Sequence, residues 1–235
     1  MFEISSKSNG ALFNVGNEKT PIFVVDDFMA NTTDIINEAA SLNYINGQEH
    51  NNYYPGVRAP VGEGYGMAVL KAIAPIFYNV FKVPKDLTLY PINGSYSLLT
   101  QHEKEMNLLQ CIPHYDTNKM FSFAVIHYIN PGEFGGTAFY RHKPTQFENI
   151  TEGRKDTYMK EAQNFFDLHG APEQKYFTRG TEHYELLNII DYKPNRLVIY
   201  PSTLLHSAFI ENPQHDVNND VRSGRLTSNF FIEFN

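Results

Sequence analysis

Short segments rich in β-branched and aromatic residues follow one another from about residue 88 to the end of the sequence, separated by turn residues such as Gly, Pro and Asn. This spacing is typical of a β-barrel or a jelly roll. The 18 Phe and 15 Tyr residues also favour β structure. The expected strands span residues 87–92, 95–101, 108–116, 121–129, 137–142, 184–192, 196–201, 204–210 and 225–234.

Helical patterns precede this β region and interrupt it once. Residues 31–44 have helix-start residues followed by apolar residues at helical spacing. Residues 67–83 are apolar and long enough for a helix, in which Pro75 predicts a kink. Residues 151–169 predict an amphipathic helix inserted into the β region. We therefore expect a mainly β single domain over 1–235, with an N-terminal helical support region (1–87), a jelly-roll core (88–235) and a helical insertion (144–185).

The composition argues against several classes of function. The net charge is −7 and no run of basic residues occurs, so nucleic acid and anionic membranes are not expected partners. No apolar stretch reaches the roughly 18 residues of a membrane span. The N-terminus lacks the pattern of a secretory signal, so we expect a cytoplasmic protein. Cys111 is the only cysteine, so any metal would be held by nitrogen and oxygen.

The sequence contains one H-x-D triplet, formed by His114 and Asp116. On a β-strand, side chains two residues apart project from the same face, so this imidazole and this carboxylate aim at one point. Two ligands do not complete a metal site, and His206 is the candidate for the third. The alternative for His206, which lies among apolar residues, is a core histidine hydrogen-bonded to a backbone carbonyl.

The last expected strand has two different faces. Arg225, Thr227 and Asn229 share one face. The opposite face is apolar apart from Ser228 and suits cover by helices; it carries Leu226, Phe230 and Ile232. An arginine that points into a barrel needs an anionic partner, because a buried unpaired charge is costly. That partner is either a bound carboxylate, which a guanidinium grips in a bidentate fork, or an internal Asp or Glu.

Two imidazoles and one carboxylate form the facial triad of non-haem Fe(II) oxygenases, which leaves coordination positions open. The order H-x-D, a long gap, His and then R-x-T resembles the 2-oxoglutarate/Fe(II)-dependent dioxygenase superfamily, in particular its prolyl-4-hydroxylase-like branch. The resemblance covers about residues 88–235, through "IPHYDTNKMFSFAVIHYINPGEFGGTAFYRHK", "LLHSAFI" and "GRLTSNFFIEF". The blocks "YPGVRAP", "GGTAFYRH" and "LLHS…GRLTSNFF" also resemble a family of uncharacterised bacterial proteins.

The resemblance implies both a fold and a set of ligands. The fold would be a double-stranded β-helix, a jelly-roll or cupin-like barrel, backed by the N-terminal helices. His114, Asp116 and His206 would bind Fe(II). Arg225, helped by Thr227, would hold the distal carboxylate of the cosubstrate 2-oxoglutarate, and dioxygen would be the second cosubstrate.

Two of these assignments have rivals within the sequence. The spacing from His206 to Arg225 is longer than is usual in the superfamily, so Arg222 is a second candidate for the anchor of 2-oxoglutarate. The strand phase shared by Arg225 and Thr227 favours Arg225. Tyr128, at the end of the expected strand 121–129, either contacts the cosubstrate or packs in the core.

Four further residues are candidates for substrate binding. Arg141 and His142 end a strand near the expected mouth of the barrel, and they either bind an acidic or polar substrate or form a solvated edge. Tyr54 and Arg58 lie in the Gly/Pro-rich loop 51–66 and either bind substrate or pack helices against the barrel. The histidines that lie in polar, loop-like or helical surroundings receive no role; they are His50, His102, His169, His183 and His215.

These patterns predict an Fe(II)- and 2-oxoglutarate-dependent oxygenase that hydroxylates a small-molecule or amino-acid/peptidyl substrate. One alternative is a non-redox, metal-binding cupin-like barrel, such as an isomerase or a small-acid-binding module. Another is a structural protein in which the three candidate ligands form a buried polar network. The insertion is either a lid over the substrate or the contact of a homodimer, and the prime substrate is not predicted.

Overall fold

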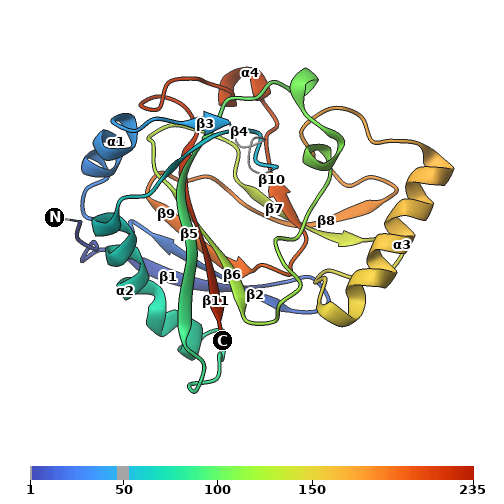
Figure 1. Ribbon diagram of the computed structural model, residues 1–235, viewed down its shortest axis with the longest axis horizontal. Coiled ribbons are helices and arrows are strands. Elements are labelled where there is room, and N and C mark those ends of the chain that lie inside the picture. Colours follow the sequence, from blue (N-terminus) through green and yellow to red (C-terminus); the bar gives the residue numbers. More distant parts are fainter. Residues whose placement is uncertain (1, 47–52) are drawn as a thin grey trace.

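The computed structural model describes residues 2–46 and 53–235. His50 and the first two residues of the expected loop 51–66 lie outside these ranges. The described chain forms two antiparallel β-sheets with helices on two sides of the molecule (Figure 1). The expectation of a mainly β fold with some helix is therefore confirmed.

The larger sheet contains most of the strands that the sequence predicts. Its members in the described chain are β1 (Asn9–Val15), β2 (Thr20–Asp26), β3 (Ile45–Asn46), β4 (Gly56–Pro60), β5 (Leu89–Leu99), β6 (Ser122–Tyr128), β9 (Arg196–Pro201) and β11 (Leu226–Phe234). Their order is β1-β2-β9-β6-β11-β5-β4-β3, and each neighbouring pair is antiparallel. The C-terminal strand β11 therefore lies inside the sheet, between β6 and β5.

The smaller sheet consists of β7 (Thr137–His142), β8 (Tyr184–Ile190) and β10 (His206–Ala208) in the order β10-β7-β8. Strand β7 coincides with the expected strand 137–142. A single backbone bridge joins His114 to His206 at the free edge of β10. The segment that carries the H-x-D triplet therefore runs beside the smaller sheet.

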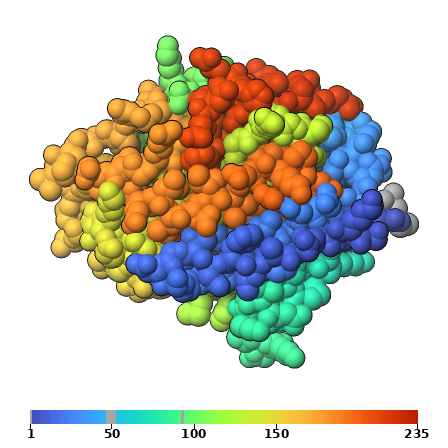
Figure 2. Space-filling view, turned by 180° about the vertical axis from the view of Figure 1, so that it is seen from behind, coloured from blue at the N-terminus to red at the C-terminus, as the bar shows by residue number. Residues whose placement is uncertain are grey.

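The first 87 residues supply strands as well as helices. Strands β1 and β2 extend the larger sheet beyond β9, whereas β4 and β3 extend it beyond β5. Seen from behind, β1 and β2 (blue) run across the surface of the molecule (Figure 2). Strand β4 corrects the expectation of a loop at this position. Gly56 allows it to approach β5, because a Cβ at Gly56 would lie 2.1 Å from the carbonyl oxygen of Leu98.

Two helices cover one face of the larger sheet. They are α1 (Thr33–Ala40) and α2 (Glu63–Asn79). The buried residues of α2 recur every four positions, as expected for a helix that packs along one stripe; they are Tyr65, Val69, Ile73 and Phe77. Pro75 lies inside α2 on its exposed side. No helix in the described ranges has the length and apolar character that a membrane crossing requires.

The two faces of β11 have the two environments that the sequence predicts. Leu226, Phe230 and Ile232 belong to the core cluster that also contains the buried face of α2. Thr227 and Asn229 lie on the other face and line a cavity. The alternation of β11 therefore separates the hydrophobic core from the candidate site.

Two expected strands differ from the structure. Residues 108–116 do not form a strand: Leu108–Cys111 is a 3₁₀ helix, in which the Asn107 side chain accepts a hydrogen bond from the backbone N–H of Gln110. The expected strands 87–92 and 95–101 form one continuous strand, β5. Its pairing with β11 shifts register between Phe231 and Ile232, close to the gap between the two expected strands.

The predicted inserted helix is present as α3 (Glu152–His169). It lies beside the smaller sheet, away from α1 and α2 (Figure 1). The Tyr158 hydroxyl of α3 lies 3.0 Å from the Tyr184 hydroxyl of β8. A short helix, α4 (Pro213–Asp216), precedes β11.

Candidate metal centre

The H-x-D segment owes its extended path to the residues before it. The 3₁₀ helix ends at Cys111, and Pro113 favours an extended Ile112, which has φ −135° and ψ 157°. The backbones of His114 and His206 then exchange two hydrogen bonds of 2.9 and 2.8 Å. Strand-like alternation therefore persists although the segment is not a regular strand.

This alternation directs both candidate ligands to one side. The Asp116 N–H donates to the carbonyl of Ser202 at 2.8 Å, which fixes the second position of the triplet. The intervening Tyr115 points away and meets Tyr158 of α3 in an edge contact of 5.9 Å between ring centroids. His114 and Asp116 thus share one face, as the sequence predicts.

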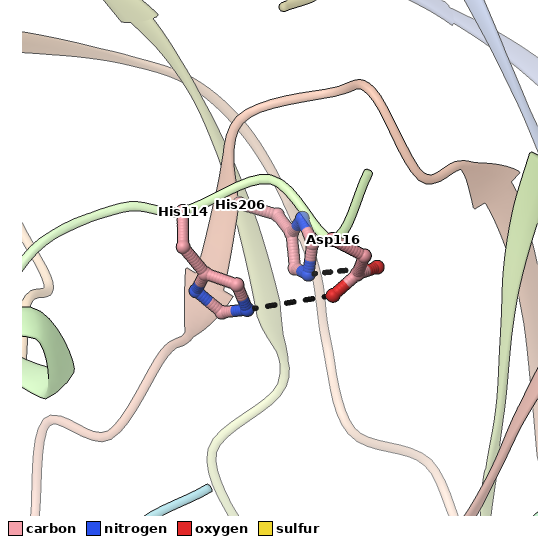
Figure 3. Close-up of side chains that lie close together, drawn as sticks. All are labelled: His114, Asp116 and His206. Atoms are coloured by element: carbon pink, nitrogen blue, oxygen red, sulfur yellow. Dashed lines mark ion pairs between the residues drawn. The ribbon is translucent and has the colours of Figure 1, made fainter. Parts of the chain in front are cut away.

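His206 joins His114 and Asp116 at one point (Figure 3). The ligand atoms of the three side chains lie within 4.8 Å of one another. The Nε2 atoms of His114 and His206 are each 3.8 Å from an oxygen of Asp116. A distance of 3.8 Å is too long for a hydrogen bond. The three side chains therefore converge without satisfying one another.

The surroundings of His206 fix its tautomer. Its Nδ1 lies 2.8 Å from the carbonyl oxygen of Leu204, which can only accept, so Nδ1 carries the proton and Nε2 presents a lone pair to Asp116. Burial lowers the pKa of His206 to about 4, so the ring is neutral at pH 7. The carbonyl bond that the sequence left as an alternative to ligation thus exists, and it prepares the other nitrogen for a ligand.

The other two side chains also have altered pKa values. Burial raises the pKa of Asp116 to about 6, although the neighbouring His114 and Arg58 oppose this shift. Partial desolvation and the nearby His206 lower the pKa of His114, although 53% of its side-chain surface is exposed at the edge of the site. At pH 7 the cluster consequently contains two neutral imidazoles and a carboxylate that is mostly ionised.

Arg225, immediately before β11, lines the same small cavity, which has a volume of about 80 Å³. It is 3% exposed. Its Nε donates to the carbonyl of Gly135 at 2.7 Å, and one terminal nitrogen donates to the carbonyl of Gly136 at 3.1 Å. The rival Arg222 is exposed and donates to the side chain of Asn37. Of the two candidate anchors, only Arg225 faces the cavity.

The two positions whose carbonyls bond Arg225, Gly135 and Gly136, have no space for a side chain. A Cβ at Gly135 would lie 1.9 Å from the carbonyl oxygen of Phe209, and one at Gly136 would lie 2.1 Å from that of Ile190. Only residues without a side chain can therefore present these two carbonyls to Arg225. The sequence predicts a turn at these glycines, but it does not reveal that they hold the arginine.

Thr227 also lines the cavity, two residues from Arg225. The side-chain amide of Asn229 donates to the Thr227 hydroxyl at 3.0 Å and to the Ser97 hydroxyl at 2.8 Å. The Thr227 hydroxyl donates a long hydrogen bond to the carbonyl of Ser97, with 3.5 Å between the two oxygen atoms. Asn229 therefore orients Thr227, a role that the shared strand face alone did not assign to it.

Tyr54 and Arg58 both line this cavity. The guanidinium carbon of Arg58 lies 4.9 Å from the centroid of the Tyr54 ring. The Tyr54 hydroxyl lies next to Arg225 and Thr227; burial raises its pKa, and Arg225 opposes this rise. Tyr54 and Arg58, the two candidates for substrate binding in the expected loop 51–66, thus line the same cavity as the metal cluster.

Tyr128 is fully buried but is not among the residues that line the cavity. Its hydroxyl bonds the hydroxyl of Thr137, which does line the cavity, at 2.7 Å. Its ring stacks on Tyr192 at 4.7 Å between centroids. Of the two roles that the sequence left open, this environment fits packing behind the cavity wall.

Arg141 and His142 do not lie at the mouth of the cavity, which corrects the expectation from sequence. Arg141 is 8% exposed and forms ion pairs with Glu148 and Glu185. His142 is fully buried, and its Nε2 lies 2.8 Å from Nε2 of His183. Glu185 and His183 are distant in sequence, so the strand-end position of Arg141 and His142 gave no sign of them.

The insertion borders a different cavity. This larger cavity of about 790 Å³ is lined by α3, by residues 170–184 and by parts of the segments around Cys111 and Ile210. His114, Asp116, His206 and Arg225 do not line it. The cavity that the insertion borders is therefore a different one from the cavity that the metal cluster lines.

Comparison with known proteins identifies a family model and several solved structures. The model of a family of unknown function (DUF6445) matches residues 7–232. No curated protein matches the chain. HygX from Streptomyces hygroscopicus, with nickel, 2-oxoglutarate and hygromycin B bound, is 13% identical, with a TM-score of 0.49, covering 92% of this chain and 84% of its own. An N-substituted L-amino acid dioxygenase from Burkholderia ambifaria AMMD is 10% identical, with a TM-score of 0.42, covering 97% and 94% of the two chains. At this level of similarity, the evidence for function comes from the residues of the chain itself.

Proposed function

This chain belongs to the DUF6445 family, whose function is unknown, and we propose that it is an Fe(II)- and 2-oxoglutarate-dependent oxygenase that hydroxylates a small-molecule or amino-acid/peptidyl substrate. One observation carries the proposal. The ligand atoms of His114, Asp116 and His206 converge within 4.8 Å on the wall of a cavity that Arg225 and Thr227 also line.

The donor set of the cluster fits Fe(II). Two neutral imidazole nitrogens and one carboxylate oxygen are the ligands of the facial triad in non-haem Fe(II) oxygenases. In the described chain, no further His, Cys, Asp or Glu joins this group of three. A structural zinc site would have four protein ligands. Three ligands beside a cavity therefore favour a catalytic metal over a structural one.

The cavity wall also fits a dicarboxylic acid. Among the described residues, Arg225 forms no ion pair with a carboxylate, and its identified partners are backbone carbonyls and Tyr54. A buried guanidinium in this state favours binding of an external carboxylate. Thr227 stands two residues away and can donate a further hydrogen bond. We assign to this pair the distal carboxylate of 2-oxoglutarate.

The strand order supports a double-stranded β-helix for the core. Along the chain, β5, β6, β9 and β11 belong to the larger sheet, whereas the His114 segment, β7, β8 and β10 belong to the smaller one. The four strands of the larger sheet are neighbours in the order β9-β6-β11-β5, and the other four in the order His114 segment-β10-β7-β8. We interpret this alternation as the jelly roll that the sequence predicts, with β1 to β4 as additions to its larger sheet.

In this function, each residue has a separate task. Iron with 2-oxoglutarate and dioxygen supplies an oxidation in which 2-oxoglutarate is decarboxylated to succinate and one oxygen atom enters the substrate. The Leu204 carbonyl keeps Nε2 of His206 deprotonated and correctly oriented. Arg225 fixes the orientation of the cosubstrate. Tyr200 packs edge-on to the His206 ring, at 4.8 Å between centroids, and excludes water from that side.

The direct test is the turnover of 2-oxoglutarate without a prime substrate. The purified protein with Fe(II) is expected to convert 2-oxoglutarate slowly to succinate, measured by mass spectrometry, and to show a weak visible charge-transfer band when both are bound without oxygen. Arg222→Gln changes an exposed arginine outside the cavity and should behave like the wild type. Stoichiometric iron without the band and without succinate would instead favour the non-redox metal-binding barrel.

A further inference from the structure

Arg58 faces the cavity from a different strand than Arg225 does. It lies on β4, where it pairs with Ser97 of β5, and Ser97 pairs in turn with Thr227 of β11. Residues directly opposite one another in a sheet project from the same face. Arg58 therefore belongs to the row of side chains that contains Thr227, two strands away from it, and it lines the cavity from this position.

Within the described ranges Arg58 forms no ion pair, although Asp116 of the metal cluster is near enough to oppose the lowering of its pKa by burial. Most arginines of the chain form ion pairs with Asp or Glu; these are Arg141, Arg154, Arg179 and Arg196. Arg222 is exposed and bonds an asparagine. The two remaining arginines, Arg58 and Arg225, both line the metal cavity, and Nε of Arg58 is buried without a hydrogen-bond partner. An orphaned guanidinium nitrogen is costly unless a ligand satisfies it.

The charges in the cavity do not balance when only metal and cosubstrate are considered. Among the residues that the structure describes, Asp116 is the only acidic one that lines the cavity, and it belongs to the metal cluster. A divalent metal with Arg58 and Arg225 contributes four positive charges. Asp116 and the two carboxylates of 2-oxoglutarate contribute three negative charges. One positive charge is left, and Arg225 already has the cosubstrate as its partner in the proposed function.

Tyr54 lies next to both arginines. The Arg58 guanidinium stands over its ring, whereas its hydroxyl lies beside Arg225 and Thr227. A ligand that bonds Arg58 therefore meets a different part of the cavity wall than one that bonds Arg225. The two guanidiniums form two anion positions, with the Tyr54 side chain against both of them.

We propose, on the basis of the proposed function, that Arg58 binds a carboxylate group of the prime substrate, so that the substrate is a small organic acid with one carboxylate near Arg58. The planar fork of a guanidinium matches the two oxygens of a carboxylate. A single remaining positive charge matches a monoanionic carboxylate better than a phosphate dianion. This narrows the substrate class from any small molecule or peptidyl side chain to molecules that carry a carboxylate, of which a small organic acid is the simplest.

Propionate and propionamide form a matched pair of probes, because they have nearly the same shape and differ in charge. Mn(II) replaces Fe(II) as a redox-inert paramagnetic ion, and saturating 2-oxoglutarate fills the position at Arg225. Relaxation of the probe methyl protons in NMR then reports binding close to the metal. The wild type is expected to give a saturable effect with propionate that is at least about tenfold stronger than with propionamide.

Three variants test whether Arg58 causes the preference for propionate over propionamide. Arg58→Gln should remove the preference for propionate, while the affinity for 2-oxoglutarate, followed by the anaerobic Fe(II) charge-transfer band, stays within about threefold of wild type. Arg58→Lys, which keeps the charge but loses the fork, should retain part of the preference. Arg222→Gln should retain all of it. The retained charge-transfer band also shows that each variant is folded.

Three outcomes would overturn this inference. The first is equal relaxation by both probes in the wild type, and the second is an unchanged preference for propionate in Arg58→Gln. The third is a loss of 2-oxoglutarate affinity in Arg58→Gln as large as that in Arg225→Gln, which would make Arg58 an anchor of the cosubstrate. Failure of the proposed function itself would look different, because the wild type would then show no charge-transfer band with Fe(II) and 2-oxoglutarate.

Discussion

Two pairs of histidines lie at the smaller sheet, and they differ in the partners of their ring nitrogens. His114 and His206 bridge at the edge of β10, whereas His142 ends β7 and His183 directly precedes β8. Burial lowers the pKa of His206 and His142 to about 4 and that of His183 to about 3. Burial and low pKa therefore do not distinguish a candidate metal site from ordinary core histidines.

The distinction lies in the hydrogen bonds. Nε2 of His142 lies 2.8 Å from Nε2 of His183, and Nδ1 of His142 lies 2.7 Å from the Thr145 hydroxyl. The His183 ring stacks on Phe165 of α3 at 4.0 Å between centroids. The two Nε2 atoms satisfy each other, and we call His142 and His183 the closed pair for this reason, although His183 borders the larger cavity. In the other cluster, the Nε2 atoms stand 3.8 Å from Asp116 and face a cavity, so their lone pairs have no donor. The candidate metal centre is therefore recognised by ligand atoms that converge without hydrogen-bonding one another, and not by burial.

The largest expected effect is on metal binding. Asp116→Ala removes the only carboxylate of the cluster and should weaken Fe(II) binding at least about 100-fold, because even residues that merely support metal ligands change affinity by about 10- to 100-fold. His183→Gln is the matched control in the closed pair and should bind one iron like the wild type. Metal analysis after gel filtration measures both. Stoichiometric iron in Asp116→Ala, or its loss in His183→Gln, would contradict the comparison.

The same contrast applies to two buried arginines. Arg141 is satisfied by Glu148 and Glu185, whereas Arg225 has no carboxylate partner in the described chain. Arg225→Gln should weaken 2-oxoglutarate binding by about 30- to 1000-fold, since losing one partner of a buried charge pair costs about 2–4 kcal/mol. The charge-transfer titration without oxygen measures this change. An affinity within threefold of wild type would remove Arg225 from the cosubstrate site.

The closed pair is expected to affect the pH dependence of the free energy of unfolding. His183 stays neutral in the folded state but takes up a proton near pH 6.5 when unfolded. Acidification below pH 6.5 therefore favours the unfolded state. His183→Gln removes this titration and should reduce the loss of unfolding free energy between pH 7.5 and pH 5 by about 1–2 kcal/mol. Urea unfolding of the metal-free proteins at both pH values tests this, and identical losses in both proteins would refute it.

Strand alternation explains why much of the candidate site could be predicted from sequence. The two-residue spacing of His114 and Asp116, and of Arg225 and Thr227, determines a shared face wherever the backbone is extended. The expected strand 108–116 is not formed, but the backbone at His114 still bridges His206 like a strand. His114 and Asp116 therefore share a face as predicted. Local geometry of this kind is encoded by neighbours in the sequence.

Contacts between distant residues explain the errors. The sequence around Arg141 and His142 contains no sign of Glu185 or His183, which β8 brings beside them. Similarly, the Gly/Pro-rich sequence at Gly56 resembles a loop, and it forms β4 only because the edge of β5 offers hydrogen bonds. Tertiary pairing overrides local propensity in both cases.

The smallest expected effect concerns Tyr128, which is buried directly behind the wall of the metal cavity. Its hydroxyl bonds Thr137 at 2.7 Å behind the cavity wall. Tyr128→Phe should lower the free energy of unfolding by about 1 kcal/mol, because a buried hydroxyl of Thr137 loses its partner. The affinity for 2-oxoglutarate should change less than about threefold, since Thr137 rather than Tyr128 borders the cavity. Thermal unfolding and the charge-transfer titration separate the two effects. A tenfold or greater loss of 2-oxoglutarate affinity at unchanged stability would instead assign the Tyr128 hydroxyl to the cosubstrate, because packing alone cannot produce that combination.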